Sequence, residues 1–423
     1  MSRDERVRVL SIAAGGAGVA RARDGRVLFV QRTAPGDDAL VRIAPSKKRW
    51  SHAQLVELFE GGPERRVPPC PHYVHCGGCT IEHLQYDAQL RTKSEIVREA
   101  MRRIGGFEIE TPEVVASPYE FRYRNRVSFT LRRQAGKQVV AGFHELGRAD
   151  RVVDITETCM LPEPSLGAVW GAIRKAWGAD AARLPSGTEL RLTLRVTRGG
   201  DASLLIEGGY GGGQPDVLLQ LVPQLLSIWH RPRLDEPAVL IGGDAYLVEQ
   251  WGDAQLRVGG ALFLQVNRGA AQLLDEHVLQ VSAAVPGLSV VDAYCGTGLH
   301  ARRLAEQGAT VTGIELDPHA VAEAQRAGVM VIEGTVESAL PSVLPTDLLI
   351  MNPPRSGVDQ QVIHAILQAP PRRMIYISCD PATLARDLAR LRDAYHIASV
   401  RCFDLFPQAT HVETVVELVC SIT

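Results

Sequence analysis

The chain has 423 residues, enough for two to four domains, and its 45% hydrophobic and 22% charged residues are ordinary for a globular protein. No apolar run reaches the roughly 18 residues that span a bilayer, so we expect no membrane partner. The formal net charge of −2 does not by itself indicate a nucleic-acid binder.

The charge is divided unevenly along the chain. Residues 1–160 contain 26 Lys and Arg against 20 Asp and Glu, and the remainder contains 20 against 28. This asymmetry suggests that the first half meets a polyanion, although an ordinary solvated surface explains it equally well. The N-terminal stretch MSRDERVRVLSIAAGG is a poor signal peptide, which favours a reducing cytoplasm.

Short strands separated by glycine-rich turns are expected near the N-terminus. The segments VRVLSI, AGVARA, RVLFV and ALVRIA, with GG, DG and PGDD turns between them, predict a small barrel within residues 1–58. The next segment, SKKRW, is a basic exposed patch that contains Lys47, Lys48 and Arg49. The segment AQLVELFEGGPERRVPP predicts a helical turn that ends at Gly and Pro.

Three of the eight cysteines are clustered in CPHYVHCGGC, as Cys70, Cys76 and Cys79, and Cys159 follows 80 residues later. Disulfides are rare in a reducing compartment, where clustered cysteines more often bind metal or do chemistry. From residue chemistry alone, four thiolates suit a zinc ion and an iron–sulfur cluster equally well.

A helix and a β-rich region follow the cysteines. Apolar residues near helical spacing, stopped by Gly105 and Gly106, predict a helix over 85–106 that packs on the C-terminal domain. Residues 59–84 and 107–255 are expected to form a central β-rich domain. In FRYRNRVSF, a strand would place Arg122, Arg124 and Arg126 on one face, where a phosphate backbone or acidic neighbours would offset their repulsion.

Strand and helix patterns alternate over residues 256–423, which predicts an α/β domain with a Rossmann-like sheet. SVVDAYCGTG is an apolar strand followed by a glycine-rich turn that opens a helix. Gly296 and Gly298 would let the backbone approach a ligand, and Glu315, after the next strand, can bind ribose hydroxyls. The spacing fits the dinucleotide pattern poorly and looks more like motif I of S-adenosylmethionine-dependent methyltransferases.

Two residues near the C-terminus are candidates for catalysis. Cys379 in YISCDPATLARDL follows a buried-looking strand, where a lowered pKa would make it a nucleophile; a small core residue is the alternative. Glu413 in THVETVVELV is an acid inside an apolar stretch, and work as a general base would explain it.

Together these segments resemble the RNA 5-methyluridine methyltransferase family, over nearly the whole chain. GGAGVARARDGRVLFVQRTAPGD looks like its N-terminal TRAM domain, an OB-like RNA-binding barrel, and the cysteine segment looks like that of the iron–sulfur-containing 23S ribosomal RNA branch. The motifs FLQVN, DAYCGTG, NPPRSG, SCDPATLARD and HVETV follow in the family's order.

The resemblance implies a reaction and a set of site residues. Cys379 would add to carbon 6 of a flipped uracil, S-adenosylmethionine would methylate carbon 5, and Glu413 would remove the carbon 5 proton. The implied cofactor-binding residues are Gln265, Tyr294, Gly296, Gly298, Glu315 and Asn352. The implied [4Fe-4S] ligands are Cys70, Cys76, Cys79 and Cys159, with zinc at the same cysteines as the alternative. The candidate RNA-binding residues are Arg122, Arg124, Arg126, Lys47, Lys48 and Arg49.

Two departures from the family pattern bear on these expectations. Asn352 replaces the usual Asp before Pro-Pro-Arg, and its amide could read uracil or, flipped, cytosine. Thr335-Val336 stands where an acid usually holds the adenine, so Glu337 is a substitute. We expect a monomeric enzyme acting on 23S ribosomal RNA; the alternatives are transfer RNA and an inactive iron–sulfur RNA-binding paralogue.

Overall fold

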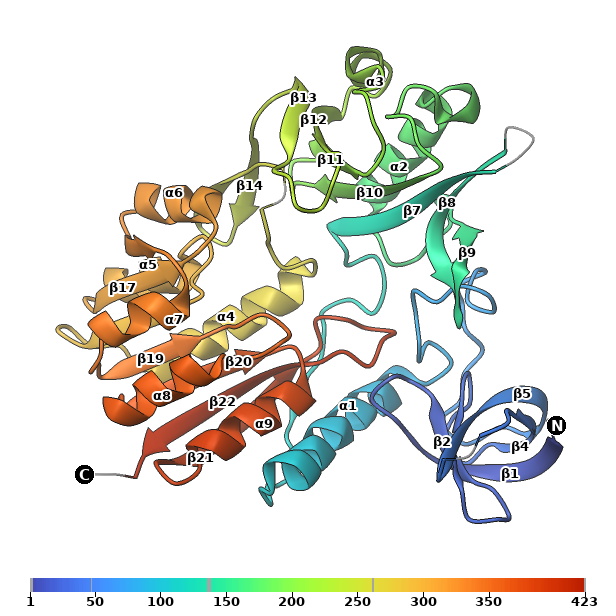
Figure 1. The fold of residues 1–423 in the computed structure, drawn as a ribbon, viewed down its shortest axis with the longest axis horizontal. Coiled ribbons are helices and arrows are strands. Elements are labelled where there is room, and N and C mark those ends of the chain that lie inside the picture. Colours follow the sequence, from blue (N-terminus) through green and yellow to red (C-terminus); the bar gives the residue numbers. More distant parts are fainter. Residues whose placement is uncertain (1–2, 47, 135–137, 261, 422–423) are drawn as a thin grey trace. The chain divides into compact units, whose positions relative to one another are not determined.

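The computed structural model describes residues 3–46, 48–134, 138–260 and 262–421. The chain forms two compact units (Figure 1): residues 1–67, 80–118 and 270–423 make the first, and residues 68–79 and 119–269 make the second. No helix in the described ranges is both long enough and apolar enough to cross a membrane.

The first unit begins with a closed five-stranded barrel in the order β1-β2-β3-β5-β4. Its small core is filled by inward-facing aliphatic residues such as Val7, Leu28 and Val41, which alternate with more exposed neighbours as the two-residue strand period requires. The strands are β1 (Arg3–Ile12), β2 (Gly18–Arg21), β3 (Val27–Val30), β4 (Asp38–Ile43) and β5 (Trp50–Glu60).

The helical turn expected after the basic patch is wrong. Residues 50–60 form β5, which pairs with both β3 and β4 and closes the barrel. Ser51 and Ala53 are buried while His52 and Gln54 are exposed, an alternation of period two. The apolar residues of AQLVELFE therefore follow a strand, and the Gly and Pro residues end that strand instead of a helix.

The rest of the first unit is an eight-stranded sheet in the order β18-β17-β16-β19-β20-β22-β21-β6. The strands from β18 to β20 are parallel, and β22 runs antiparallel to β20. The strands are β6 (Val114–Val115), β16 (Ser289–Ala293), β17 (Thr310–Glu315), β18 (Met330–Glu333), β19 (Leu348–Met351), β20 (Arg373–Ser378), β21 (Tyr395–Phe403) and β22 (Glu413–Cys420).

Connecting helices flank this sheet (Figure 1). Aspartates cap the starts of α6, α8 and α9; Asp380, for example, accepts hydrogen bonds from the N–H groups of Ala382 and Thr383. The helices are α1 (Tyr86–Ala100), which continues as a π-turn (Met101–Gly105), α4 (Arg268–Ser282), α5 (Leu299–Glu306), α6 (Pro318–Arg326), α7 (Val336–Ala339), a 3₁₀ turn (Leu340–Ser342), α8 (Gln360–Gln368) and α9 (Pro381–Leu391).

The second unit contains a seven-stranded sheet in the order β13-β12-β11-β10-β7-β8-β9 and the hairpin β14-β15. Phe129, Trp170 and Trp177 pack together at the centre of its core. The strands are β7 (Arg126–Gln134), β8 (Gln138–Glu145), β9 (Arg148–Asp154), β10 (Glu189–Val196), β11 (Ala202–Glu207), β12 (Leu225–Arg231), β13 (Val239–Gly243), β14 (Leu247–Trp251) and β15 (Ala254–Val258), with helices α2 (Pro164–Ala176) and α3 (Pro215–Leu221) and a 3₁₀ turn (Ala179–Ala181).

The expected fold class, a multidomain α/β protein with an N-terminal barrel, is confirmed.

Candidate active site

The candidate site residues of the first unit gather at one edge of its sheet. Glu315, Tyr294, Asn352 and Cys379 lie at or just beyond the carboxyl ends of the neighbouring parallel strands β17, β16, β19 and β20. Glu413 begins the antiparallel strand β22, so it lies at the same edge. Ligands of open α/β sheets bind at this edge.

The glycine-rich turn after β16 is held against Glu315. The Gly296 N–H donates to Glu315 Oε2 at 2.9 Å, and the Leu316 and Asp317 N–H groups donate to Glu315 Oε1 at 2.7 and 2.8 Å. Gly298 has φ +73°, and a Cβ there would lie 2.9 Å from the Ala324 side chain. Only glycine therefore allows this turn to pack on α6, and the fixed carboxylate fits a ribose.

A cavity of about 460 Å³ opens beside this turn. Tyr294 lines it, and burial raises the pKa of its phenol well above the ordinary value. Glu337, the expected substitute for the family's adenine-binding acid, also lines the cavity. The remaining lining residues are Pro354, Ser356, Gly357, Val358, Asp359, Gln360, Arg386 and Arg390.

The pairing of β20 with β22 brings the two candidate catalytic residues together. Ser378 pairs with Thr414 in this antiparallel ladder. Cys379, which follows Ser378, therefore lies across from Glu413, which precedes Thr414. Glu413 is only 4% exposed, whereas Cys379 is half-buried.

Burial dominates the electrostatics of this pair. It raises the pKa of Glu413 to about 7, with the nearby Arg355 guanidinium opposing the rise. It also raises the pKa of Cys379 to about 11, helped by the Glu413 carboxylate and opposed by Arg355. The lowered thiol pKa expected from the strand-end position is wrong, because loss of solvation outweighs the favourable charge. A nucleophilic Cys379 thus needs help from a base or a cation once substrate is bound.

Sequence reasoning missed the residues that fix the NPPRSG loop. Thr383 Oγ1 donates to the Arg355 carbonyl at 3.0 Å, and Arg386 Nη2 donates to the Ser356 carbonyl at 2.7 Å. The buried Asp387 carboxylate accepts the Val358 N–H at 3.0 Å. All three side chains come from α9 in SCDPATLARD, so the acid and the hydroxyl on the helix that follows Cys379 were the available signal.

The remaining expected cofactor residues divide between the two units. The Asn352 N–H donates to the Ala293 carbonyl at 3.4 Å, which ties the end of β19 to the end of β16. Gln265 belongs to the second unit, where its carbonyl accepts a hydrogen bond from Asn125 Nδ2 at 3.1 Å.

All four cysteines of the expected cluster lie in the second unit and pack in or against its core. Cys76, Cys79 and Cys159 are buried. Burial, followed by the neighbouring thiols of Cys70 and Cys76, raises the pKa of Cys159 to about 12. The four soft thiols suit an iron–sulfur cluster or zinc chemically, but no group of His, Cys, Asp or Glu in the described ranges is arranged to hold a metal ion.

The three alternating arginines do not share a strand face. Only Arg126 belongs to β7, and Arg122 has φ +58°, which breaks the strand period. The backbone N–H of Arg122 donates to the Met160 carbonyl, and its guanidinium donates to the Cys159 carbonyl at 2.7 Å. Arg124 interacts with Tyr123, Cys79 and Cys159. The backbone of this segment instead hydrogen-bonds with Met160 and Leu161, so Arg122 and Arg124 lie beside the cysteines.

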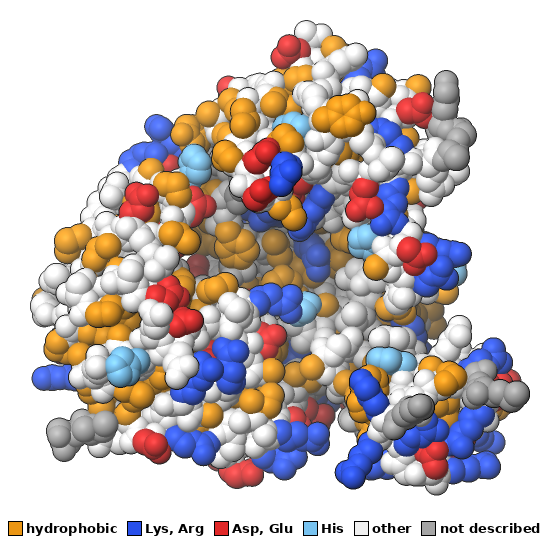
Figure 2. All heavy atoms as spheres, in the orientation of Figure 1, with side chains coloured by type: hydrophobic (Ala, Val, Ile, Leu, Met, Phe, Trp, Pro, Cys, Tyr) orange, Lys and Arg blue, Asp and Glu red, His pale blue; other side chains and the backbone are white. Residues whose placement is uncertain are grey.

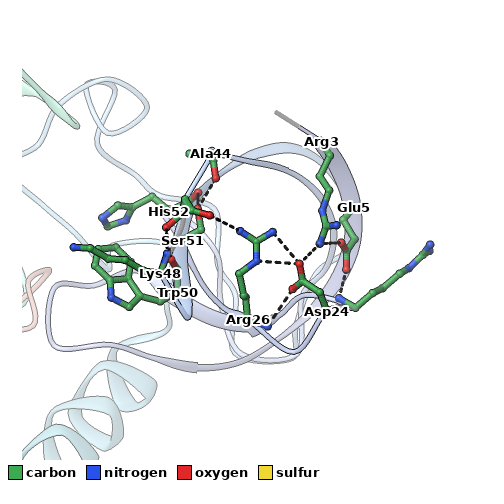
Figure 3. Close-up of polar contacts among 11 residues, drawn as sticks. Arg3, Glu5, Asp24, Arg26, Ala44, Lys48, Trp50, Ser51 and His52 are labelled. Carbon is green, nitrogen blue, oxygen red and sulfur yellow. Dashed lines mark hydrogen bonds and ion pairs between the residues drawn. The ribbon is translucent and has the colours of Figure 1, made fainter. Parts of the chain in front are cut away.

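An aromatic and basic patch covers part of the barrel. Phe29, Trp50 and His52 lie with ring centroids 5.4–6.1 Å apart. Lys48 Nζ lies 4.6 Å from the centre of the Trp50 ring, and Figure 3 shows Lys48, Trp50 and His52 close together. Lys and Arg side chains gather around the barrel surface, at the lower right of Figure 2. Of the other two expected RNA-binding residues of this segment, Arg49 is exposed and Lys47 lies outside the described residues.

Comparison with protein families identifies two matches in the first unit. Residues 343–420, which include Cys379 and Glu413, match a family described as tRNA (Uracil-5-)-methyltransferase. Residues 291–346, which include the glycine-rich turn, match a general methyltransferase domain.

Full-length relatives extend the similarity over both units. Uncharacterized RNA methyltransferases of Gloeobacter violaceus and Nitratidesulfovibrio vulgaris are 33% and 34% identical, each over 97% of this chain and 95% of the relative. The crystal structure of Pyrococcus abyssi tRNA (uracil-54, C5)-methyltransferase, in complex with S-adenosyl-L-homocysteine, matches with a TM-score of 0.75 and 26% identity. It covers 98% of this chain and 100% of that chain.

Proposed function

Because this chain belongs to the RNA (uracil-5-)-methyltransferase family, and so is an S-adenosylmethionine-dependent RNA methyltransferase, we propose that it methylates carbon 5 of one uridine in RNA. The observation that carries the proposal is the strand register that sets Cys379 across from the buried Glu413. A nucleophile and a base side by side at a ligand-binding edge suit addition to a pyrimidine followed by proton removal.

The steps assign one task to each residue. The Cys379 thiolate forms a bond from Sγ to carbon 6 of uracil, and the electron pair of the 5,6 double bond makes carbon 5 nucleophilic. Carbon 5 takes the methyl group of bound S-adenosylmethionine as the sulfur–methyl bond breaks, and S-adenosylhomocysteine leaves with that electron pair on its sulfur. Glu413 then takes the carbon 5 proton, the double bond re-forms, and the electrons of the Sγ–carbon 6 bond return to Cys379.

The residues that would hold the donor fit it chemically. The fixed Glu315 carboxylate would accept hydrogen bonds from the ribose hydroxyls beside the Gly296 turn. Tyr294 and Glu337 line the adjacent cavity, where an aromatic ring and an acid suit adenine. Asn352, at the end of β19, would complete these contacts, and a donor or uracil contact by Gln265 of the second unit stays an expectation of the sequence resemblance.

Four cysteine thiols would hold a [4Fe-4S] cluster in the second unit, with Arg122 and Arg124 supporting the Cys159 segment. We assign this cluster a structural role that shapes an RNA surface. A reducing cytoplasm is the proposed compartment. Zinc at the same thiols is the alternative.

The barrel would contribute RNA affinity through its aromatic patch. Bases stack on aromatic rings, and nearby Lys and Arg side chains attract the backbone without reading sequence. Lys48 over Trp50 combines both features at one place.

For the RNA class we propose 23S ribosomal RNA, from the likeness of the cysteine segment and barrel to that branch. Transfer RNA is the second candidate. It is favoured by the name of the matching family and by the P. abyssi enzyme, which acts on tRNA uracil-54.

Methyl transfer tests the activity and the RNA class together. Anaerobically purified protein is incubated with labelled S-adenosylmethionine and unmodified ribosomal or transfer RNA, and the RNA is digested to nucleosides. We expect label in 5-methyluridine from ribosomal RNA; label from transfer RNA alone would reverse the choice of substrate. Label in 5-methylcytidine would mean that Asn352 changes the base, and no label with RNA still bound would indicate an inactive paralogue.

Covalent capture tests the nucleophile separately. RNA carrying 5-fluorouridine has no carbon 5 proton to lose, so the enzyme–RNA adduct should persist on a denaturing gel when the donor is present. Cys379→Ala should abolish this capture. Equal capture by Cys379→Ala and the wild type would refute the assignment of the nucleophile.

A further inference from the structure

The loop that precedes Glu413, residues 404–412, is unusual because it is almost entirely buried. Loops normally run over the surface, since a buried loop must find partners for its backbone polar groups. Phe406 is half-buried and His411 is exposed, and the other residues of this loop are buried. We call this segment the base loop, because it connects β21 to the proposed catalytic base.

Gln408 is the best-held residue of the base loop. It is fully buried and has φ +71°. Its backbone N–H donates to Gln89 Oε1 at 2.9 Å, while Gln89 Nε2 donates to Gln408 Oε1 at 2.8 Å. The Gln408 carbonyl accepts the N–H groups of Thr80 and Ile81 at 2.9 and 3.1 Å. The side-chain amide of Gln89 thus hydrogen-bonds both the backbone and the side chain of Gln408, as a partner strand would bond the backbone.

A second contact from the same helix holds the start of the loop. Lys93 Nζ forms an ion pair with Asp404 and donates to the Phe406 carbonyl at 3.0 Å, and both side chains of the pair are fully buried. Tyr86 OH donates to Asp404 Oδ2 at 3.0 Å. Tyr86, Gln89 and Lys93 are spaced three and four residues apart, so they lie on one face of α1.

The other end of the loop reaches the barrel and the reaction centre. Thr410 Oγ1 donates to the Ala14 carbonyl of the barrel. His411 Nδ1 lies 3.5 Å from Arg355 Nη2, and Arg355 is the cation that opposes the raised pKa values of both Cys379 and Glu413. Only Val412 then separates this contact from Glu413.

We propose that Gln89 and Lys93 of α1 are positioning residues for Glu413: by holding the base loop, they serve removal of the carbon 5 proton and not addition of the thiolate. A buried ion pair is a weak source of stability but a precise constraint on geometry, which fits this role. Cys379 is carried by β20 and α9, outside the base loop. The proposal rests on the proposed function, because it takes Glu413 as the base.

The test uses Gln89→Met, which keeps the length of the side chain and removes its hydrogen bonds. In a single turnover with uridine RNA and labelled donor, addition and methylation should proceed, while transfer of the carbon 5 proton to Glu413 and cleavage of the Sγ–carbon 6 bond slow by about 10- to 100-fold. A methyl-labelled covalent adduct should therefore accumulate on denaturing gels. Capture of 5-fluorouridine RNA, which requires no proton removal, should keep the wild-type rate.

Two further variants make the result specific. Gln85→Met is the matched control, since Gln85 is an exposed glutamine one turn earlier beside the same helix, and it should behave as the wild type. Gln408→Gly removes the amide from the other side, together with the hydrogen bond that Arg66 Nη2 donates to it at 2.9 Å, while tolerating the positive φ. If Gln89→Met does not fold, Gln408→Gly should show the same slowing of adduct resolution.

The outcomes separate the two proposals. Unchanged adduct resolution in folded Gln89→Met and Gln408→Gly overturns the positioning role. Equal slowing of fluorouridine capture and of turnover also overturns it, because the loop would then serve the whole site. Failure of the wild type to capture fluorouridine RNA would instead refute the proposed function.

Discussion

At the scale of single residues, Glu413 needs to be buried beside Cys379 and yet be deprotonated to act. Its pKa of about 7 means that the carboxylate form is lost as the pH falls through neutrality. We therefore expect kcat for methylation to fall as the pH drops below about 7. Glu413→Gln should lower kcat by about 10²- to 10⁴-fold and trap the RNA adduct.

The pH dependence of Glu413→Gln provides the control for this prediction. The glutamine variant has no carboxylate to titrate, so its residual adduct resolution should show no loss of rate near pH 7. A wild-type profile that is flat between pH 6 and pH 8 in single-turnover resolution would contradict the assignment of Glu413 as the base.

The same raised pKa predicts an effect on stability. The folded state holds the Glu413 proton more tightly than the unfolded state, whose pKa lies near 4.5. The contribution of Glu413 to the free energy of unfolding is therefore fully present below about pH 4.5. It is lost as the pH rises through about 7, by roughly 3 kcal/mol in all. Urea unfolding should show Glu413→Gln gaining stability over the wild type at pH 8 but not at pH 5, and an equal difference at both pH values would refute this.

At this scale the sequence predicted residue identities better than residue environments. Cys379 stood out because it follows a buried-looking strand, and Glu413 because it is an acid inside an apolar stretch; the register sets them across from each other. The expected direction of the thiol's pKa shift was wrong, since burial in the fold and, after it, the charge of Glu413 both raise the pKa, and neither can be read from the residues around Cys379 in the sequence. Gln89 and Gln408 are 319 residues apart, and no local pattern connects them.

At the scale of elements, β5 supplies the aromatic patch, because strand alternation turns Trp50 and His52 outward while Ser51 is buried. One base stacked on Trp50 would contribute about 1–3 kcal/mol. Trp50→Ala should therefore weaken RNA binding by roughly 5- to 150-fold, as measured by filter binding. Phe59→Ala, an exposed aromatic nine residues along the same strand, is the matched control, and an equal loss there would argue against a specific platform.

The buried ion pair between Lys93 of α1 and Asp404 leads to a prediction about the free energy of unfolding. Lys93→Met would leave the fully buried Asp404 carboxylate without its cation, which costs about 3–5 kcal/mol of unfolding free energy. Lys93→Met combined with Asp404→Asn should recover most of this loss, because the amide oxygen still accepts the Phe406 N–H. Chemical denaturation of the two single variants and the double variant measures the coupling, and additive losses would disprove it.

Elements with a clear period were predictable, and those set by partners were not. The strands around the glycine-rich turn and the helix after Gln85 follow their apolar patterns. The stretch after Trp50 contains apolar residues compatible with either period, and its pairing with β3 and β4 decided for a strand. The arginines of FRYRNRVSF alternate as a strand would, but hydrogen bonds from Arg122 to the Met160 and Cys159 carbonyls override that pattern.

At the scale of the whole molecule, the sequence resemblance describes the catalytic half more fully than the cysteine region. The order of motifs from DAYCGTG to HVETV maps onto consecutive strand ends of one sheet, so family and fold agree there. The cysteines come from two segments of the second unit, residues 70–79 and residue 159. The proposed ligand role of these cysteines rests on their spacing in the sequence, and thiolates alone do not distinguish zinc from an iron–sulfur cluster.

Metal analysis of anaerobically purified protein tests that choice. A [4Fe-4S] cluster predicts about four irons and four sulfides per chain, lost in both Cys76→Ser and Cys159→Ser. Cys420→Ser, which alters a cysteine of β22 in the other unit, should keep them. Because the cluster is assigned a structural role, removing it should lower the melting temperature while fluorouridine capture by the folded protein persists. One zinc per chain, or no metal in freshly prepared anaerobic protein, would contradict the cluster, and loss of capture without unfolding would give it a part in catalysis.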